Sequence, residues 1–289
     1  MTLRCIWNER ALLGEGPVWH PGERRLYFVD IKGKAVHRCD PGSGVRASFL
    51  LPEEPGCVAL RARGGLVVAL RSGLSFFDPG SGSVAKIASP EANIPGNRFN
   101  DGKCDRRGRF FVGTMDDAET DPTGSLYCLF PDLRLKRLLG GFVVPNGIGW
   151  SPDDRIMYLT DSVNRTILAF SYAPDTGDIA DRRVFATVAD DAGYPDGLTV
   201  DSEGCVWSAH WDGWRVTRYD PDGNIDRVVR LPVPRPTSCA FGGSALDKLY
   251  VTSASTGLSA AQLAAAPLSG SVFELDVDAT GLPASFFRG

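Results

Sequence analysis

The sequence is poor in the features that mark several large classes of protein. No run approaches the roughly 18 consecutive apolar residues that a membrane-spanning helix requires, and the opening MTLRCIWNERALLGEG lacks a basic stretch followed by an apolar one. We therefore expect no membrane anchor, no signal peptide and a cytoplasmic location. The formal net charge is −4 and no run of basic residues occurs, which argues against nucleic acid or an anionic membrane as a partner.

Reactive nitrogen and sulfur side chains are also few or scattered. Histidine occurs three times at widely separated positions, so a histidine-based metal site is not expected. The seven cysteines include no CxxC pair, and their odd number favours reduced thiols over a disulfide framework. No GxSxG segment is present, which argues against the nucleophile elbow of serine hydrolases.

Glycine and proline, with 33 and 20 copies, are abundant, and they punctuate a repeated unit. Each unit runs from a polar residue and a glycine through a short alternating strand, a tight turn and a second strand rich in aromatic and branched residues. Strong copies occur at 14–30, 100–114, 145–161 and 195–209, and weaker ones at 56–70 and 237–253. Repeats spaced by about 40–50 residues are typical of propeller blades.

The repeats predict an all-β fold, a six-bladed β-propeller that forms a single domain over residues 1–289. Each unit continues into a third strand, often followed by an aspartate-proline turn as in LSFFDPGSG (74–82). The units are expected to form a ring because one sheet alone cannot bury both of its faces. The N-terminal LRCIWN (3–8) has no blade of its own, so we expect it to pair with SVFELDV (271–277) and close the ring. The alanine-rich segment 259–267 is expected to be a short helix.

One position of the repeat gathers acidic and amide side chains. In the four strong copies, the residue before the glycine is Glu15, Asp101, Asn146 and Asp196. Taken singly, such pairs with glycine are ordinary turn formers. In a propeller, however, the innermost strand of each blade begins beside the central channel, so these side chains are expected to converge. Carboxylates that close repel one another unless they are protonated or bound to a cation, and an all-oxygen set suits Ca²⁺, Mg²⁺ or Mn²⁺, with Zn²⁺ also possible.

Two further sets of side chains recur on the blade strands. Trp19, Trp150 and Trp207 are expected to pack between blades rather than to stack on a ligand. Cys57 and Cys239 fall near the axis in the two weaker copies, where small buried packing residues are the simpler interpretation. The alternative is that these thiols, as soft ligands, influence which metal ion the site selects.

The segments around these positions resemble the family of regucalcin (senescence marker protein), gluconolactonase and luciferin-regenerating enzyme. The resemblance spans nearly the whole chain and is densest in LGEGPVW (13–19), NRFNDGKCDRRGRFFVGTM (97–115), NGIGWSPD (146–153), YPDGLTVDSEGCVW (194–207) and SCAFGGSALDKLYVTSA (238–254). It implies a six-bladed propeller with one divalent metal ion on the axis, with Ca, Zn, Mg, Mn and Fe all open. It also implies metal ligands at Glu15, Asn146 and Asp196, and substrate contacts at Arg98 and Asn100.

The chain departs from the family pattern after the GTM segment. A further acidic residue of the family falls on Ala118, which Asp117 and Glu119 flank. Either neighbour could contact substrate, and Glu119 is the candidate that we retain. Asp101 is not among the implied ligands, so a substrate-binding or supporting role is expected for it. The segment DDAETDPTG (116–124) is shorter than its counterpart in the animal regucalcins, which implies a trimmed lid.

These residues predict a divalent-metal-dependent hydrolase that converts a small-molecule sugar γ- or δ-lactone into the aldonic acid. A cation with open coordination positions polarises an ester carbonyl, and Asp196 is the candidate catalytic base that activates water. Arg98 offers a rigid fork of donors, and Asn100 offers both a donor and an acceptor for sugar hydroxyls.

Other functions of the same scaffold stay open at this point. A calcium-binding regulatory protein without lactonase activity would need no second polar cluster, so the pair of Arg98 and Asn100 argues against it. An organophosphate or aryl-ester hydrolase tends to have a more apolar site, whereas the segment NRFND (97–101) is polar. A protein-interaction propeller would not need three axial acids. Three residues follow a second strand, where a loop can reach the rim of the cavity, and one of them is a candidate for contact with the substrate: His210, Trp211 or Trp214.

Overall fold

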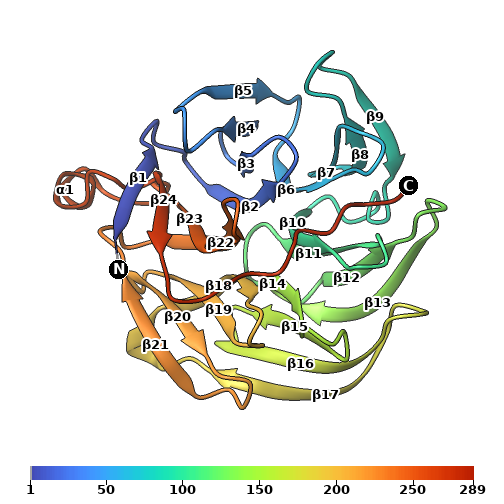
Figure 1. Ribbon diagram of the computed structural model, residues 1–289. Helices are drawn as coiled ribbons and strands as arrows, with labels where there is room; N and C mark the ends of the chain where they lie inside the picture. Colours follow the sequence, from blue (N-terminus) through green and yellow to red (C-terminus); the bar gives the residue numbers. More distant parts are fainter. Residues whose placement is uncertain (1) are drawn as a thin grey trace.

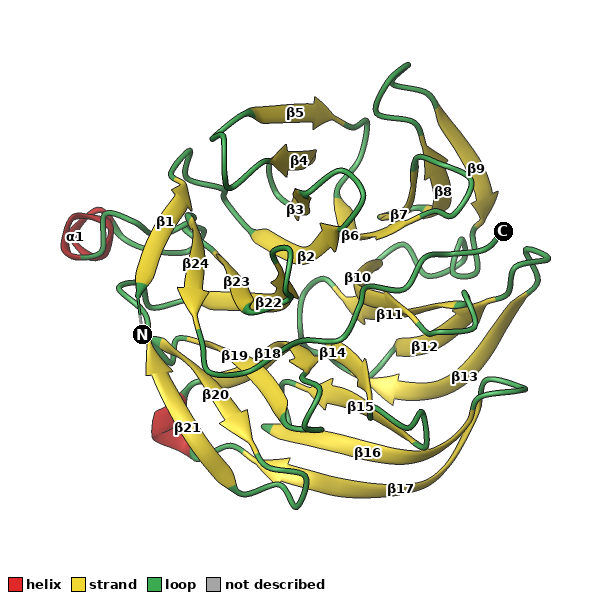
Figure 2. Ribbon diagram, in the orientation of Figure 1, coloured by secondary structure: helices red, strands yellow, loops and turns green. Residues whose placement is uncertain are grey.

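The computed structural model describes residues 2–289, which form six four-stranded antiparallel sheets arranged around a central axis (Figures 1 and 2). The innermost strands are β2 (Gly14–His20), β6 (Pro55–Leu60), β10 (Asn97–Cys104), β14 (Pro145–Trp150), β18 (Tyr194–Val200) and β22 (Pro236–Gly242). Each of them packs against the inner strands of both neighbouring blades. The ring is therefore closed, and the predicted six-bladed β-propeller is confirmed.

Outward from the axis, each blade continues through three further strands. The first blade adds β3 (Arg25–Asp30), β4 (Ala35–Cys39) and β5 (Arg46–Leu50), and the second adds β7 (Leu66–Leu70), β8 (Gly73–Phe77) and β9 (Val84–Ala88). The third adds β11 (Phe110–Asp116), β12 (Gly124–Leu129) and β13 (Leu135–Phe142), and the fourth adds β15 (Ile156–Asp161), β16 (Thr166–Ala173) and β17 (Asp178–Thr187). The fifth adds β19 (Val206–Trp211), β20 (Arg215–Tyr219) and β21 (Ile225–Arg230), and a 3₁₀ turn at Asp190–Ala192 precedes its inner strand β18.

The sixth blade combines strands from the two ends of the chain. Its order from the axis is β22, β23 (Lys248–Ser253), β24 (Val272–Asp276) and the N-terminal β1 (Leu3–Trp7). β1 runs antiparallel to β24 with Arg4 opposite Glu274, and these side chains form an ion pair of 2.8 Å. The predicted closure of the ring is thus confirmed.

The predicted alanine-rich helix is also present. It is α1 (Ala260–Ala265), which lies between β23 and β24 and begins at a capping box formed by Ser259 and Gln262. Within residues 2–289, no helix combines the length and the apolar character needed to cross a membrane.

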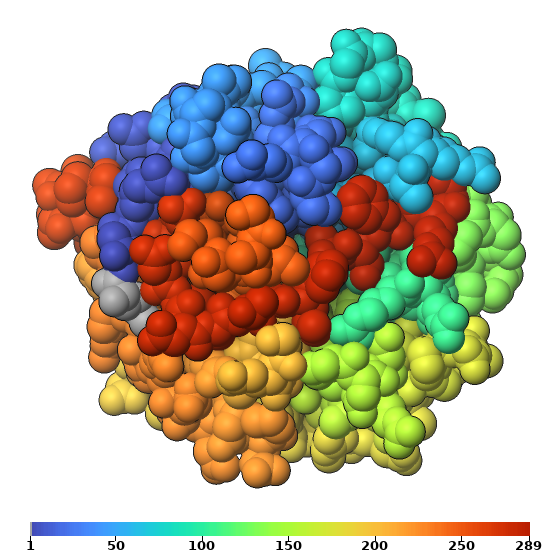
Figure 3. All heavy atoms as spheres, viewed as in Figure 1, coloured from blue at the N-terminus to red at the C-terminus, as the bar shows by residue number. Residues whose placement is uncertain are grey.

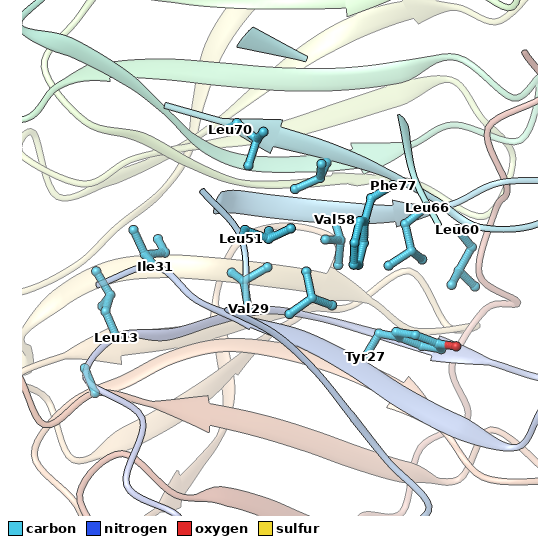
Figure 4. Packing of buried hydrophobic residues seen from close by; sticks show 13 residues of the cluster. Leu13, Tyr27, Val29, Ile31, Leu51, Val58, Leu60, Leu66, Leu70 and Phe77 are labelled. Carbon is cyan, nitrogen blue, oxygen red and sulfur yellow. The ribbon is translucent and has the colours of Figure 1, made fainter. Parts of the chain in front are cut away.

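The core lies between the blades. Figure 4 shows the cluster that joins the first two blades, in which Val29 of β3 packs with Val58 of β6 and Phe77 of β8. These strands are rich in branched and aromatic residues, which fill a pleated, two-sided interface. Blade-to-blade packing of this kind holds the inner strands in fixed positions around the axis.

The three tryptophans take the positions between blades that the sequence predicted. Trp19 of the first blade stacks on Tyr250 of the sixth, with ring centroids 5.6 Å apart. The ring of Trp150 lies 5.2 Å from that of Phe111 in the third blade. The third tryptophan, Trp207, lies 6.0 Å from Phe241 in the sixth blade.

Every inner strand carries a bulge near its beginning. Its register with the next strand shifts between residues 15 and 18, 55 and 57, 99 and 102, 145 and 148, 195 and 198, and 236 and 239. A bulge leaves an extra residue unpaired and redirects its side chain. Asp101, Asn146 and Asp196 therefore lie on these bulges, and Glu15 pairs with Val29 at the edge of its own. All four lie within the strands, and not just before them as the sequence suggested.

The glycines that follow two axial residues are required by the close approach of neighbouring strands. A Cβ on Gly147 would collide with the backbone nitrogen of Leu198, and one on Gly197 would collide with Ser238. Inner strands of adjacent blades thus meet where no side chain fits. This contact is what brings Asn146 and Asp196 to the axis.

The C-terminal residues cross the axis at the end where the inner strands finish, opposite the end where those strands begin. Figures 1 and 3 show this segment running over the middle of the face. Its backbone contacts the end of one inner strand and the turn after another. Phe287 N–H donates to the carbonyl of Leu60, the last residue of β6, at 2.8 Å, and Arg288 N–H donates to the Gly108 carbonyl, in the turn after β10, at 3.1 Å. Since Glu15 and Asp196 lie where the inner strands begin, the tail closes the end away from them.

Candidate active site and metal centre

A cavity of about 420 Å³ opens at the end of the axis where the inner strands begin. Its polar lining includes five of the predicted ligand and substrate positions and one flanking acid: Glu15, Arg98, Asn100, Asn146, Asp196 and Glu119. Its walls include Met115, Val144, Tyr194 and Trp211. The structure therefore brings together, in one cavity, every predicted site residue except Asp101.

The three predicted metal ligands are buried side chains from different blades. Glu15, Asn146 and Asp196 come from β2, β14 and β18 and are only 6%, 7% and 6% exposed. The Oδ1 atoms of Asn146 and Asp196 are both buried without a hydrogen-bond partner in residues 2–289. Buried oxygens in proteins are nearly always paired, and these two belong to residues that line the cavity, which makes them candidate ligand atoms.

The orientation of Asn146 is set by a residue that sequence reasoning missed. Its Nδ2 donates to Ser162 Oγ at 3.4 Å, and Ser162 Oγ donates to the Pro195 carbonyl at 2.7 Å. Because the amide nitrogen is turned to Ser162, the amide oxygen is left for the cavity. Ser162 lies in the turn after β15, where nothing in the sequence distinguishes it from other turn serines.

The electrostatics of the trio favour a cation. Burial, with the charge of Asp101 adding to it, raises the pKa of Glu15 to about 8. Burial also raises the pKa of Asp196 well above its ordinary value, and the negative charges of Glu15, Asp101 and Glu119 act in the same direction. Acids that resist ionisation together become stable as anions beside a divalent cation. With two unpaired oxygens and an all-oxygen donor set, these residues fit a hard cation.

Asp101 lies behind the ligands. It lines a second, smaller cavity of about 100 Å³ that the tail covers at residues 282–285. Lys103 lines the same cavity, and its Nζ donates to the Leu198 carbonyl at 2.7 Å. Burial raises the pKa of Asp101, and the positive charge of Lys103 opposes that rise. We predicted either a substrate-binding or a supporting role for Asp101. Its position behind the ligands favours the supporting role, as a nearby charge.

The two axial cysteines have the character of packing residues. Cys57 and Cys239 are 0% and 1% exposed. Burial raises the pKa of Cys239 to about 12 and that of Cys57 well above its ordinary value. Thiols with raised pKa values are poor metal ligands because the thiolate is the form that binds.

Arg98 and Asn100 are fixed by contacts that span two blades. Asn100 Nδ2 donates to the Pro145 carbonyl at 3.0 Å, while its Oδ1 accepts from Arg98 Nη1 at 2.9 Å. Arg98 Nε donates to Asp117 Oδ1 at 2.7 Å. Both side chains are thus held rigid at the cavity wall.

The two acids that flank Ala118 have different positions. Glu119 lines the cavity and has a left-handed backbone, with φ of 58°. Asp117 is absent from the cavity lining and pairs instead with Arg98. The geometry therefore favours Glu119 over Asp117 as the acid within reach of a ligand.

Of the three rim candidates, Trp211 lines the cavity. The guanidinium of Arg235 lies 4.5 Å from its ring centre. His210 is buried, and its Nδ1 lies 2.9 Å from the Ala192 carbonyl. Trp214 is 41% exposed and lies outside the lining.

Away from the axis, Asp201, Glu203 and Cys205 also lie close enough together to be considered as metal ligands. The guanidinium of Arg218 already occupies that cluster, with Nη2 2.8 Å from Asp201 and 2.5 Å from Glu203. This group is therefore a structural ion-pair cluster.

Comparison with known proteins identifies the family. A family model described as SMP-30/Gluconolactonase/LRE-like region matches residues 13–255. The chain belongs to this family. The resemblance that we based on five sequence segments is confirmed.

Three members of the SMP-30/gluconolactonase/LRE-like family illustrate the similarity. The chain is 38% identical over 289 residues to 6-deoxy-6-sulfogluconolactonase from Pseudomonas putida, covering 100% of this chain and 99% of that protein. It is 40% identical over 286 residues to L-arabinolactonase from Azospirillum brasilense, covering 98% and 94%. Its fold matches regucalcin from Agrobacterium tumefaciens, described as a calcium-binding protein, with a TM-score of 0.96 and 29% identity over 100% of this chain and 98% of that one.

Proposed function

We propose that this protein hydrolyses a neutral sugar γ- or δ-lactone to the aldonic acid, with one divalent cation held by Glu15, Asn146 and Asp196. The observation that carries the proposal is the pair of unpartnered buried oxygens on Asn146 and Asp196, in the same cavity as Arg98 and Asn100. Relatives named as a sulfogluconolactonase and an arabinolactonase align along nearly the whole chain, so lactone hydrolysis is the chemistry of this enzyme class.

The cation would supply Lewis acidity toward the ester carbonyl of the lactone. Asp196 would accept the proton of the attacking water through the carboxylate oxygen that is not used for the cation. Asn146 stays neutral, so the three ligands carry two negative charges, and the charge of a divalent cation is balanced. The all-oxygen donor set favours a hard cation such as Ca²⁺, Mg²⁺ or Mn²⁺, and Zn²⁺ and Fe²⁺ stay open.

Arg98, Asn100 and Glu119 would hold the hydroxyl groups of the sugar. Arg98 provides donors and Glu119 provides acceptors, while Asn100 provides both types of atom. Asp117 pairs with Arg98 and is shared with Lys32 and Arg71, whereas Glu119, which lines the cavity, forms no ion pair within residues 2–289. An anionic substituent on the sugar would therefore meet an unbalanced carboxylate, which favours a neutral lactone as substrate.

One experiment separates this proposal from the other functions of the scaffold. Metal content is measured by elemental analysis, and hydrolysis of glucono-, xylono-, arabino- and galactonolactones is followed by proton release before and after chelation. We expect turnover that chelation abolishes and that one divalent cation restores. Bound cation without turnover of any lactone would favour a calcium-binding protein, and turnover of aryl esters or organophosphates alone would favour the other hydrolase.

A further inference from the structure

A network of charged side chains stands beside the cavity and joins three consecutive blades. Its members are Lys32 after β3, Glu54 before β6, Arg71 after β7, Arg98 on β10 and Asp117 after β11. All except Arg98 come from loops at the end of the propeller where the cavity opens. Only Arg98 among the five also lines the cavity.

Asp117 is the centre of this network. Its Oδ1 accepts from Arg98 Nε at 2.7 Å and from Lys32 Nζ at 3.4 Å. Its Oδ2 accepts from Arg71 Nη2 at 2.5 Å. Both carboxylate oxygens are therefore used, and neither is left for a ligand.

Glu54 holds the network from the other side. It accepts from Arg71 Nε and Nη2 at 2.9 and 2.7 Å and from Lys32 Nζ at 3.2 Å. Burial raises the pKa of Asp117, but hydrogen bonds from Arg71 and Arg98 outweigh it and hold the pKa well below its usual range. Asp117 is accordingly ionised at neutral pH, and charge-assisted hydrogen bonds of the network hold its carboxylate in place.

The consequence for Arg98 is a guanidinium fixed at two of its nitrogens. Nε is held by Asp117, and Nη1 donates to the Phe99 carbonyl at 3.1 Å and to Asn100 Oδ1 at 2.9 Å. Nη2 forms no hydrogen bond within residues 2–289 and is the nitrogen left for a ligand. With 5% of the residue exposed, Arg98 has little freedom to rearrange when a ligand arrives.

We propose that Asp117 is a positioning residue for substrate binding, which orients Arg98 toward the lactone by bridging it to Arg71 of the second blade and Lys32 of the first. This inference rests on the proposed lactonase function and extends it to a residue that does not touch the substrate. A purely structural ion pair would stabilise the contact between blades without changing the Michaelis constant. A positioning residue affects the Michaelis constant because the ordering of Arg98 must then be done when substrate binds.

The test compares Asp117→Asn with Asp117→Glu and with Asp226→Asn as a matched control. Asp226 accepts from Arg218 Nη1 at 2.9 Å, in the ion-pair cluster that Asp201, Glu203 and Asp226 form around the buried Arg218, and it lies on β21, the outermost strand of its blade. Kinetics are measured on whichever of D-glucono-δ-lactone and L-arabino-γ-lactone the wild-type, cation-loaded protein turns over faster. Thermal unfolding and cation affinity by calorimetry are measured on the same samples.

We expect Asp117→Asn to raise KM about tenfold, the loss typical of one hydrogen bond between charged groups, with kcat changed less than about threefold and cation affinity unchanged. In Asp117→Glu, KM should return part of the way to the wild-type value. Asp226→Asn should lower the unfolding temperature and leave KM unchanged. Should Asp117→Asn fail to fold, Arg71→Gln serves instead, with an expected rise in KM of about twofold to threefold. An active wild type whose KM is unchanged in these variants overturns the inference alone. A wild type inactive on all four lactones named above overturns the proposed function and this inference with it.

Discussion

Asn146 and Asp196 lie on the inner strands of adjacent blades, and each holds a buried Oδ1 atom with no hydrogen-bond partner in residues 2–289. The close approach of these strands at Gly147, where a Cβ would meet the backbone of Asp196 and Leu198, produces the relationship. Leaving a buried polar atom unpaired costs about 1–3 kcal/mol, so two such atoms in the lining of one cavity are a cost to stability that a bound cation would remove. That reasoning leads to the first of four predictions.

Cation binding should stabilise the folded protein. At a free cation concentration of 100 times Kd, linkage predicts about 2.7 kcal/mol of added stability. Thermal or urea unfolding, measured with a chelator and with added Ca²⁺, Mg²⁺, Mn²⁺ or Zn²⁺, should show the shift. Asp196→Asn should lose most of the response, and an equal shift in this variant would contradict the assignment of the site.

Ser162→Ala should weaken cation binding without touching a ligand. Ser162 holds the amide nitrogen of Asn146, and loss of a partner that orients a ligand typically costs about 10–100-fold in affinity. The hydrogen bond is 3.4 Å long, so we expect a loss near tenfold, measured by calorimetric titration. A control is Ser171→Ala, which changes an exposed serine on β16 and should leave the affinity unchanged.

Glu119→Gln should relax selectivity against anionic lactones. Two unit charges about 4 Å apart in water repel by about 1 kcal/mol, so the ratio of kcat/KM for 6-phosphoglucono-δ-lactone to that for glucono-δ-lactone should rise about fivefold. Steady-state kinetics on both lactones provide the ratio. Glu9→Gln, a substitution of an exposed acid outside the cavity lining, should leave it unchanged; an unchanged ratio in Glu119→Gln as well would remove Glu119 from the substrate site.

His210 should make stability depend on pH in the acid range. Burial lowers its pKa to about 4, from an ordinary value near 6.5. Between these values the unfolded chain binds the proton and the folded chain does not, so stability falls as pH drops from about 6.5 to 4, by up to about 1.4 kcal/mol per unit. Above about 6.5 the residue contributes no slope.

The effect of His210 is isolated by comparison with His210→Asn, in which the carboxylates titrate as before. Urea unfolding in the presence of a chelator, at several pH values, should show a shallower decline for the variant. Parallel curves for the two proteins between pH 4 and 6.5 would contradict the prediction.

The blade architecture was predictable from the sequence because each blade is a local unit. Strands that follow one another pair with one another, so an alternating pattern such as that of residues 195–209 specifies its own hairpin. The repeat also specified which position is axial, since Glu15, Asn146 and Asp196 occupy the same place in their blades. Pairing of the 3–8 segment with 271–277 followed because one blade would otherwise lack a strand.

Contacts between blades could not be read from the sequence. Asp117 and Glu119 are two residues apart, yet one holds Arg98 and the other lines the cavity. Asp101 occupies the repeat position of the ligands, but the second cavity, covered by the C-terminal tail, contains it. Local pairing thus determined the fold and the axial positions, whereas the tertiary structure decided the direction of each side chain, because that depends on neighbours from distant parts of the chain.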